Sequence, residues 1–220
     1  MDYVIIIICY HKKYIAVKIK THKGKLNMKI YLIRHGQTTG DIEDRFGGDY
    51  DDHLTKLGKT QAKELAQKLK PYQIEKIYHS TRIRAIETAS IVNAITSIPL
   101  KAEKDLRERN AYGILTGELK KDAKEKYPEL IEQLKNPKAT IQGAVPYDKF
   151  KQRVLNIFSK LAGFDSDVIA IITHGGVISC FLREIIGKER KTLNDCVIIE
   201  LEANGGEFSI IRSEGLEFKG

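Results

Sequence analysis

Short apolar runs alternate along the chain with segments whose apolar residues recur at helical spacing. Residues 30–33 form the first run, which is typical of a buried strand. A helix pattern follows over residues 55–70, then a second strand pattern over residues 74–78 and a second helix pattern over residues 81–95. In this second helix Ile86 is one of the positions expected to face the core. The alternation predicts a parallel sheet.

The alternation returns after a less regular stretch. Residues 102–146 contain helix-like segments interrupted by prolines, and we expect them to form an insertion over one end of the sheet. Beyond it, a helix pattern over residues 150–161 precedes residues 168–172, the clearest buried strand in the sequence. Another helix, over residues 177–186, is expected to end at Gly187.

Two β-prone runs near the end of the chain complete the predicted fold. Residues 197–201 and 208–211 are joined through Asn204-Gly205-Gly206, a sequence typical of a hairpin. Strands that alternate with helices predict an α/β fold, a three-layer sandwich with a largely parallel central sheet. The ligand site of such a fold is expected beyond the carboxyl ends of the strands.

The first 27 residues stand apart from this pattern. Residues 3–9 and 14–20 are β-prone and predict a short hairpin, and a polar stretch follows them. Met28 immediately precedes the first strand of the alternating pattern. We therefore hypothesise that Met28 is a native start, that residues 28–220 form a complete domain, and that residues 1–27 are an added leader.

The net charge is positive, but most of it lies in this leader. The formal charge is +8 over 220 residues, and residues 1–27 contribute +5 through six lysines and one acid, which leaves +3 for the rest. Lysines elsewhere are mixed with acids along the expected helix faces. This distribution favours solvated helix surfaces over a nucleic-acid-binding protein.

Apolar runs and cysteines exclude further classes of protein. The longest apolar run, residues 4–9, is far shorter than the roughly 18 residues that span a bilayer. Cys9, Cys180 and Cys196 lie far apart without CxxC pairing, which favours reduced thiols over a disulfide framework or a zinc site. We expect a soluble, cytoplasmic protein with no membrane partner and no metal; a homodimer is left open.

Two histidines occupy equivalent positions in the predicted sheet. His35 and His174 each follow a buried strand after one intervening residue, and each precedes a glycine. Because the carboxyl ends of parallel strands meet at one edge, we expect the two imidazoles to converge. A following glycine lets a ligand approach the backbone closely.

Two arginines are expected at the same edge. Arg34 precedes His35 directly, and Arg84 lies near the start of the helix that follows residues 74–78. Guanidinium groups match the oxygens of a phosphate group in a bidentate geometry. Together with the histidines, they indicate a pocket for an oxyanion.

The segments that carry this chemistry are Arg34-His35-Gly36-Gln37-Thr38, residues 80–89 and residues 173–178. In order and spacing they resemble the histidine phosphatase superfamily, the group of cofactor-dependent phosphoglycerate mutases and broad phosphomonoesterases. The resemblance extends over about residues 29–186 and implies a phosphoglycerate mutase-like fold.

The resemblance also implies roles for individual residues. It makes His35 the nucleophile that becomes phosphohistidine, with no metal required. The implied phosphate-binding and substrate-binding positions are Arg34, Gly36, Gln37, Thr38, Asp41, Arg84, His174 and Gly175. Many members have Asn where this chain has Asp41, and an anionic side chain would repel phosphate unless it is neutralised or turned away.

The leaving alkoxide requires a proton, so we expect a carboxylic acid in the pocket. The superfamily's acid lies in a Leu-x-Glu segment, which points to Glu108 as the second catalytic residue. The loop after Glu108 is one residue longer than the mutase-like pattern. Glu103, Asp105 and Glu118 are therefore kept as substitutes.

Three functions are compatible with these residues. The first is a metal-independent phosphomonoester hydrolase that acts on a small phosphorylated metabolite without a cofactor. The second is a cofactor-dependent phosphoglycerate mutase, which would use 2,3-bisphosphoglycerate and is favoured by Glu108-Arg109 and Tyr112-Gly113. The third, a non-catalytic phospho-ligand-binding module, is disfavoured because the nucleophile and its expected partners are all present.

Overall fold

A six-stranded sheet forms the centre of the protein. The structure is a computed structural model that describes residues 3–10, 13–20, 27–163 and 166–220. The sheet has the order β5-β4-β6-β3-β7-β8. Its strands are β3 (Met28–Arg34), β4 (Lys76–His79), β5 (Leu100–Ala102), β6 (Val168–Thr173), β7 (Arg190–Asn204) and β8 (Glu207–Phe218). The first four strands in this order are parallel, whereas β7 and β8 are antiparallel to their neighbours.

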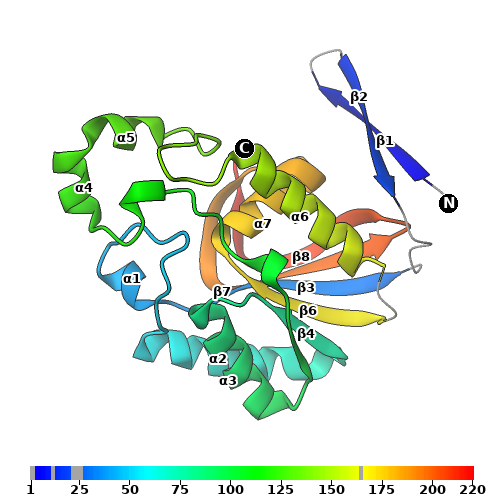
Figure 1. Ribbon diagram of the computed structural model, residues 1–220. Helices are drawn as coiled ribbons and strands as arrows, with labels where there is room; N and C mark the ends of the chain where they lie inside the picture. Colours follow the sequence, from blue (N-terminus) through cyan, green and yellow to red (C-terminus); the bar gives the residue numbers. More distant parts are fainter. Residues whose placement is uncertain (1–2, 11–12, 21–26, 164–165) are drawn as a thin grey trace.

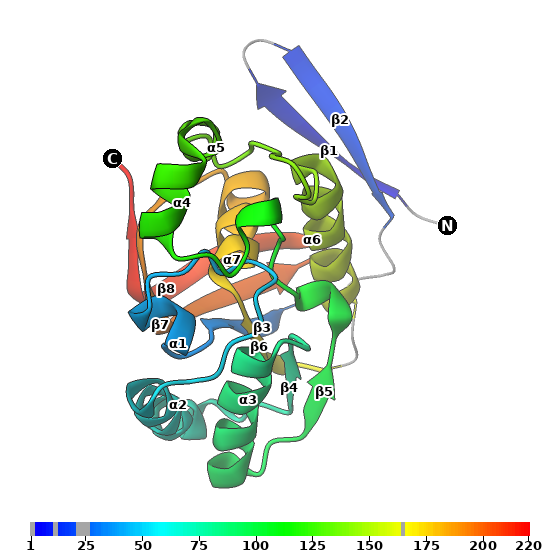
Figure 2. The same cartoon turned by 60° about the vertical axis from the view of Figure 1, so that its left-hand side comes forward.

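Helices cover both faces of this sheet, as Figures 1 and 2 show. The longer ones are α2 (Lys56–Leu69), α3 (Ile83–Thr96), α6 (Tyr147–Leu161) and α7 (Gly175–Phe181). Helices α2 and α3 lie on one face, and α6 and α7 lie on the other (Figure 1). The predicted α/β sandwich with a largely parallel sheet is therefore confirmed.

Each face of the sheet has its own apolar core because side chains alternate between the two faces of a strand. On β3, Ile30 and Leu32 pack in the core with α6 and α7, while Tyr31 and Ile33 pack in the core with α2 and α3. Strand β6 lies between β3 and β4 and is buried from Ile169 to Thr173. This double burial explains why the central strands are uniformly apolar.

Some element boundaries differ from the sequence prediction. Ile86 is 39% exposed, because the buried face of α3 is formed by smaller residues such as Ala85, Ala89 and Val92. The helix expected over residues 177–186 begins earlier, and its last turn is a π-helix, η4 (Leu182–Ile186), that ends at Gly187 with φ +77°.

The terminal hairpin also extends beyond the predicted runs. Strands β7 and β8 span 15 and 12 residues. Only the middle of β7 is continuously buried, from Val197 to Leu201. The apolar signal therefore stops well before the strand does.

The insertion of residues 102–146 has little regular structure. It contains the 3-10 turns η2 (Lys104–Leu106) and η3 (Gly113–Leu115) and the short helices α4 (Lys120–Lys126) and α5 (Pro128–Gln133). Phe46, Leu115, Ala123 and Ile141 form a small apolar cluster of its own. The insertion thus contributes to a small cluster apart from the two cores of the sheet, and Leu106 of η2 also packs in the core with α6 and α7.

Four short elements remain. Strands β1 (Tyr3–Tyr10) and β2 (Lys13–Lys20) pair with each other in an antiparallel two-stranded sheet, which both views show apart from the central sheet (Figures 1 and 2). Helix α1 (Thr39–Ile42) follows β3, and the 3-10 turn η1 (Lys70–Tyr72) follows α2. Within the described residues, no helix combines the length and apolar character needed to cross a membrane.

Candidate active site

The register of two parallel strands brings the two histidines together. Arg34 of β3 pairs with Thr173 of β6, and the His35 backbone N–H donates to the Thr173 carbonyl at 3.0 Å. The chain therefore leaves both strands at the same level of the sheet. The imidazole centroids of His35 and His174 lie 5.1 Å apart, so the predicted convergence is present in the structure.

His35 is held as a neutral imidazole with a defined tautomer. Its Nδ1 lies 2.8 Å from the Gly36 carbonyl oxygen, which can only accept, so Nδ1 carries the proton. Nε2 keeps its lone pair and accepts a hydrogen bond from Arg84 Nε at 3.1 Å. Burial, together with the Arg84 and Arg34 guanidiniums, lowers the pKa of His35 well below its ordinary value of 6.5. The lone pair of the imidazole is therefore on Nε2.

His174 is fully buried and offers a hydrogen-bonding atom to the site. Its Nε2 lies 2.7 Å from Ser80 Oγ, which also accepts the Arg82 backbone N–H. This pattern favours donation from the Ser80 hydroxyl to Nε2, which leaves the proton of His174 on Nδ1. Burial and the Arg84 cation lower the pKa of His174 well below its ordinary value. Within the described residues, His174 Nδ1 has no hydrogen-bond partner.

Arg34, the last residue of β3, is anchored at one end of its guanidinium. Its Nη1 donates to the Leu193 carbonyl at 3.1 Å and lies 3.1 Å from Asp195 Oδ1. Its Nε is buried and lacks a hydrogen-bond partner in the part of the chain that the structure describes. This atom and His174 Nδ1 are therefore two buried donors at the site that are not used by the protein.

Arg84 is more fully bonded than the sequence suggested. The guanidinium is buried, and besides His35 it binds the Asp52 carboxylate at 2.9 Å and the carbonyls of Tyr50 and Gly48 at 2.6 and 2.9 Å. Its position at the start of α3 agrees with the prediction, but its fork is not open toward the pocket. These bonds orient the Nε–H of Arg84 toward His35 Nε2.

The loop after His35 is packed so closely that it requires glycine. A Cβ on Gly36 would lie 2.7 Å from the Gly58 carbonyl oxygen at the start of α2, and a Cβ on Gly58 would collide with the Gln37 carbonyl. The Gly36 backbone N–H donates to Thr88 Oγ1 of α3 at 3.2 Å. The loop is thus fixed against both helices of this face.

The polar groups of Gln37, Thr38 and Asp41 are used within the protein. The Gln37 side chain accepts from the Thr55 hydroxyl at 2.8 Å. Thr38 caps α1, and the Asp41 carboxylate accepts from both the backbone and the hydroxyl of Thr38. Asp41 Oδ1 also lies 3.8 Å from Arg34 Nη2. The Arg34 cation therefore offsets the negative charge of Asp41. Without such a cation, an anionic side chain at this position would repel a phosphate group unless it were turned away.

Glu108 reaches the site from the insertion. Its Oε2 accepts the Gly176 N–H at 2.8 Å, and its Oε1 accepts the Arg109 N–H at 2.8 Å. Any side chain on Gly176 would collide with this carboxylate. Glu108 is thereby placed at the first turn of α7, two residues after His174.

The three substitute acids are placed differently. Glu103 pairs with Lys160 of α6 at 2.9 Å. Asp105 and Glu118 contribute backbone carbonyls to hydrogen bonds with Arg153 and Phe46. Of the four acids, Glu108 is the one whose carboxylate contacts the backbone beside His174.

Within the described parts of the chain, no group of three or more His, Cys, Asp and Glu side chains is arranged to hold a metal ion. Cys180 is buried and Cys196 is half-buried, and both are free thiols.

The sequence as a whole matches the histidine phosphatase superfamily (branch 1) over residues 30–214. The chain belongs to this superfamily. The family resemblance seen in the motifs is therefore confirmed.

Relatives in the superfamily include both mutase-like proteins and phosphatases. Phosphoglycerate mutase-like protein 4 of Arabidopsis thaliana is 28% identical over 191 residues, which cover 83% of this chain and 83% of that protein. The metal-independent phosphoserine phosphatase of the same plant is 29% identical and covers 68% of this chain and 65% of its own length. The solved structure of YhfR from Bacillus stearothermophilus has a TM-score of 0.77 at 25% identity, over 84% of this chain and 95% of that chain.

The candidate site includes residues that sequence reasoning did not single out. Ser80 holds His174, and its position at the end of β4 within a recognised motif was the available signal. Asp52 holds Arg84 from a loop with no regular pattern, so no sequence signal pointed to it. Asp195 lies beside Arg34 in an irregular part of β7 and was missed because that part has no apolar pattern. Gln61 lies in α2, where the helical pattern alone indicates no role at the site.

Proposed function

We propose that this protein is a metal-independent phosphomonoester hydrolase that works through a phosphohistidine intermediate on His35. The observation that carries the proposal is the combination of a lone pair on His35 Nε2 with two buried donors not used by the protein, Arg34 Nε and His174 Nδ1. Buried polar atoms without a partner cost free energy, so their presence around one nucleophile is most simply explained by a ligand rich in oxygen. A phosphoryl group has this character.

In the first step, the His35 Nε2 lone pair attacks phosphorus and the bond from phosphorus to the ester oxygen breaks. The electron pair of that bond stays on the leaving oxygen, which takes a proton from the Glu108 carboxylic acid and departs as an alcohol. The free donors Arg34 Nε and His174 Nδ1 bind the remaining phosphoryl oxygens. The Arg84 Nε–H, released from the His35 lone pair as that pair attacks, also stabilises their charge.

In the second step, water attacks the phosphorus of phosphohistidine. The nitrogen to phosphorus bond breaks, its electron pair returns to His35 Nε2, and the Glu108 carboxylate takes the proton released by water. Inorganic phosphate leaves, and both residues are restored to their initial protonation states. The cycle consumes one phosphomonoester and one water molecule and needs no cofactor.

The arginine of the mutase-like segment favours hydrolysis over mutase activity. Arg109 is 4% exposed, and it donates to the carbonyls of Val145 and Pro137 at 2.9 and 3.2 Å and also to that of Ala139. Its guanidinium is therefore used to fix the insertion rather than to bind a substrate. The sequence feature that favoured the mutase has a structural explanation.

Membership of the superfamily supports a broad class of substrate. Members act on phosphorylated small molecules, and relatives are named as a phosphoserine phosphatase and as 2-carboxy-D-arabinitol-1-phosphatases. We infer a small phosphorylated metabolite as the substrate of this protein and assign no particular one.

Covalent labelling tests the proposal. Wild-type protein is incubated with ³²P-labelled phosphomonoester, quenched in base and assayed for acid-labile label. We expect label in the wild type and in the control His53→Gln, a histidine whose side chain is 65% exposed, and none in His35→Gln. Acid-labile label that persists in His35→Gln would contradict the mechanism. Conversion of 3-phosphoglycerate only when 2,3-bisphosphoglycerate is added would favour the mutase.

A further inference from the structure

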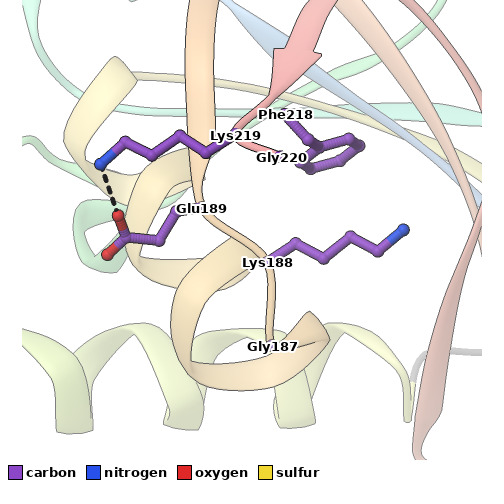
Figure 3. Close-up of a pocket in the computed structure, with 6 residues that line it drawn as sticks. All are labelled: Gly187, Lys188, Glu189, Phe218, Lys219 and Gly220. Atoms are coloured by element: carbon purple, nitrogen blue, oxygen red, sulfur yellow. Dashed lines mark hydrogen bonds and ion pairs between the residues drawn. The ribbon is translucent and has the colours of Figure 1, made fainter.

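Two cavities of the protein are lined by neither His35 nor His174, and they differ in the residues that line them. One, of about 400 Å³, is lined by residues 187–189 and 218–220 (Figure 3). It lies beyond η4, at the opposite end of this helical segment from His174. The other, of about 610 Å³, is lined by Arg34 together with Gln61, Glu64 and residues 193–197. Of these two cavities, the second therefore includes a residue of the proposed active site, Arg34.

The wall of this second cavity is an irregular segment of β7. The pairing of β7 with β8 shifts register between Leu193 and Ile198, so the intervening residues leave the ladder. Cys196 adopts φ +50°, a conformation that a side chain makes unfavourable. Such backbone strain persists only where surrounding contacts impose it, so the contacts of residues 194–197 must hold this conformation.

This segment contacts two consecutive residues of the Arg-His-Gly motif. Asp195 Oδ1 lies 3.1 Å from Arg34 Nη1, and the Leu193 carbonyl accepts from the same nitrogen at 3.1 Å. The Cys196 N–H donates to the His35 carbonyl at 3.3 Å. The irregularity of β7 thus turns a carboxylate and a backbone donor toward the end of β3.

Gln61 of α2 lines the same cavity as Asp195 and contacts the loop that follows His35. Its Oε1 accepts the Gln37 N–H at 2.8 Å. Asp195 is only 19% exposed, so its attraction to Arg34 is little screened by water.

We propose that Asp195 is a positioning residue, which fixes the Arg34 guanidinium so that its free Nε–H is directed at a phosphoryl oxygen held at His35. A guanidinium is planar, so a carboxylate and a carbonyl on Nη1 define the orientation of the whole group. The same Arg34 guanidinium carries the buried Nε that has no hydrogen-bond partner among the described residues. The inference rests on the proposed function in one respect, that the ligand is a phosphoryl group.

A double-mutant cycle tests this inference. Asp195→Asn keeps the shape of the side chain and removes its charge, and it is compared with Arg34→Ala and with the double variant. The probe is orthovanadate, an analogue of the transferred phosphoryl group, and its affinity is measured by isothermal titration calorimetry. The matched control is Glu64→Gln, a carboxylate of the same cavity for which the structure shows no bond to Arg34.

We expect Asp195→Asn to weaken vanadate binding by about tenfold in the wild-type background and by less than about twofold in the Arg34→Ala background. The control should bind as the wild type does. A purely structural role would give the same loss in both backgrounds, and such additivity would overturn the inference. If Asp195→Asn does not fold, as judged by circular dichroism, Asp195→Ser is used in the same cycle.

Turnover measured in parallel separates this inference from the proposed function. Coupled vanadate binding without any phosphatase activity would contradict the hydrolase and leave the role of Asp195 supported. Phosphatase activity with additive variants would support the hydrolase and overturn the role of Asp195. A wild-type protein that neither binds vanadate nor turns over a phosphomonoester would contradict both.

Discussion

The carboxyl edge of the sheet and the insertion of residues 102–146 hold their proposed catalytic groups in different ways. His35 and His174 follow strands that are buried on both faces, and the register of β3 with β6 alone brings them together. Glu108 lies on a segment without regular structure and depends on side-chain anchors. Groups at strand ends obtain their position from the core, whereas a group on a loop needs contacts made for that purpose.

The anchors of the insertion are Arg109 and Gly113. Arg109 directly follows Glu108, and its guanidinium donates to the carbonyls of Val145 and Pro137 at the other end of the insertion. Burial lowers the pKa of Arg109 below its ordinary value, as expected for a cation held by neutral carbonyls. Gly113 has φ +49°, and a side chain there would collide with the Gln142 backbone. The insertion is thus fixed by a few specific contacts.

The comparison is tested most strongly at Glu108. We expect Glu108→Gln to slow the hydrolysis of alkyl phosphates by about 10² to 10⁴, the usual contribution of a general acid. Formation of phosphohistidine from p-nitrophenyl phosphate should be nearly unchanged, because nitrophenolate leaves without a proton. The pre-steady-state burst of nitrophenol measures this first step apart from the hydrolysis of the intermediate.

Glu125→Gln is the matched control for this experiment, since it changes an exposed acid of α4 in the same insertion. Equal losses of the first step for both substrates in Glu108→Gln would move the acid to Glu103, Asp105 or Glu118. The insertion would then supply the general acid from another residue, and the bond between Glu108 and Gly176 would not position it.

At the edge of the sheet the corresponding test is Arg84. We expect Arg84→Ala to lower kcat/KM by about a hundredfold, the scale for loss of one preorganised donor. Arg84→Lys should recover little of this loss, because an ammonium cannot reproduce bonds to His35, Asp52 and two carbonyls at once. Melting temperatures of both variants separate loss of catalysis from loss of fold. Wild-type kcat/KM in Arg84→Ala would show that the donor beside His35 Nε2 has no catalytic role.

The third test is the anchor of the insertion. Removing Arg109 leaves several buried carbonyls without their donor, so we expect Arg109→Ala to lower the free energy of unfolding by about 2 to 3 kcal/mol. Activity on alkyl phosphates should fall by about tenfold, since Glu108 loses its support. Urea denaturation and steady-state kinetics give the two values. Lys135→Ala is the control, an exposed position of the same insertion, and a variant of Arg109 as stable as this control would contradict the anchoring role.

The same division explains how much could be predicted from the sequence. The strands before His35 and His174 are uniformly apolar because both faces are covered, so their ends, and with them the pair of histidines, could be located. The ends of β7 and β8 could not, because their residues are exposed and lack an apolar pattern. The order of strands at the antiparallel edge likewise depends on pairing that no local pattern encodes.

Contacts between distant segments account for the rest of the site. Arg34 and Arg84 were predicted to bind phosphate oxygens through their guanidiniums, yet each guanidinium is also bonded to a carboxylate far away in the sequence, Asp195 and Asp52. Gln37 and Thr38 were placed by resemblance among the phosphate-binding positions, and the structure shows their polar groups bonded to Thr55 and Asp41. Residue types and spacing identify which groups reach an edge, but only packing determines which of their atoms stay free.

The smallest effect is expected from removal of the leader. A chain that begins at Met28 should retain kcat/KM within about twofold and a melting temperature close to that of the full chain, as for changes away from the core and the site. The proposed site residues all follow Met28, and β1 and β2 pair only with each other among the described strands, whereas β3 lies between β6 and β7. Met28 itself is fully buried at the start of β3, so it must be kept. A chain that begins at Gly36, which lacks β3, is the matched control and should not fold. If the chain that begins at Met28 is also insoluble or inactive, the leader is part of the domain. The positions of the strand ends would then depend on the leader as well as on the six-stranded sheet.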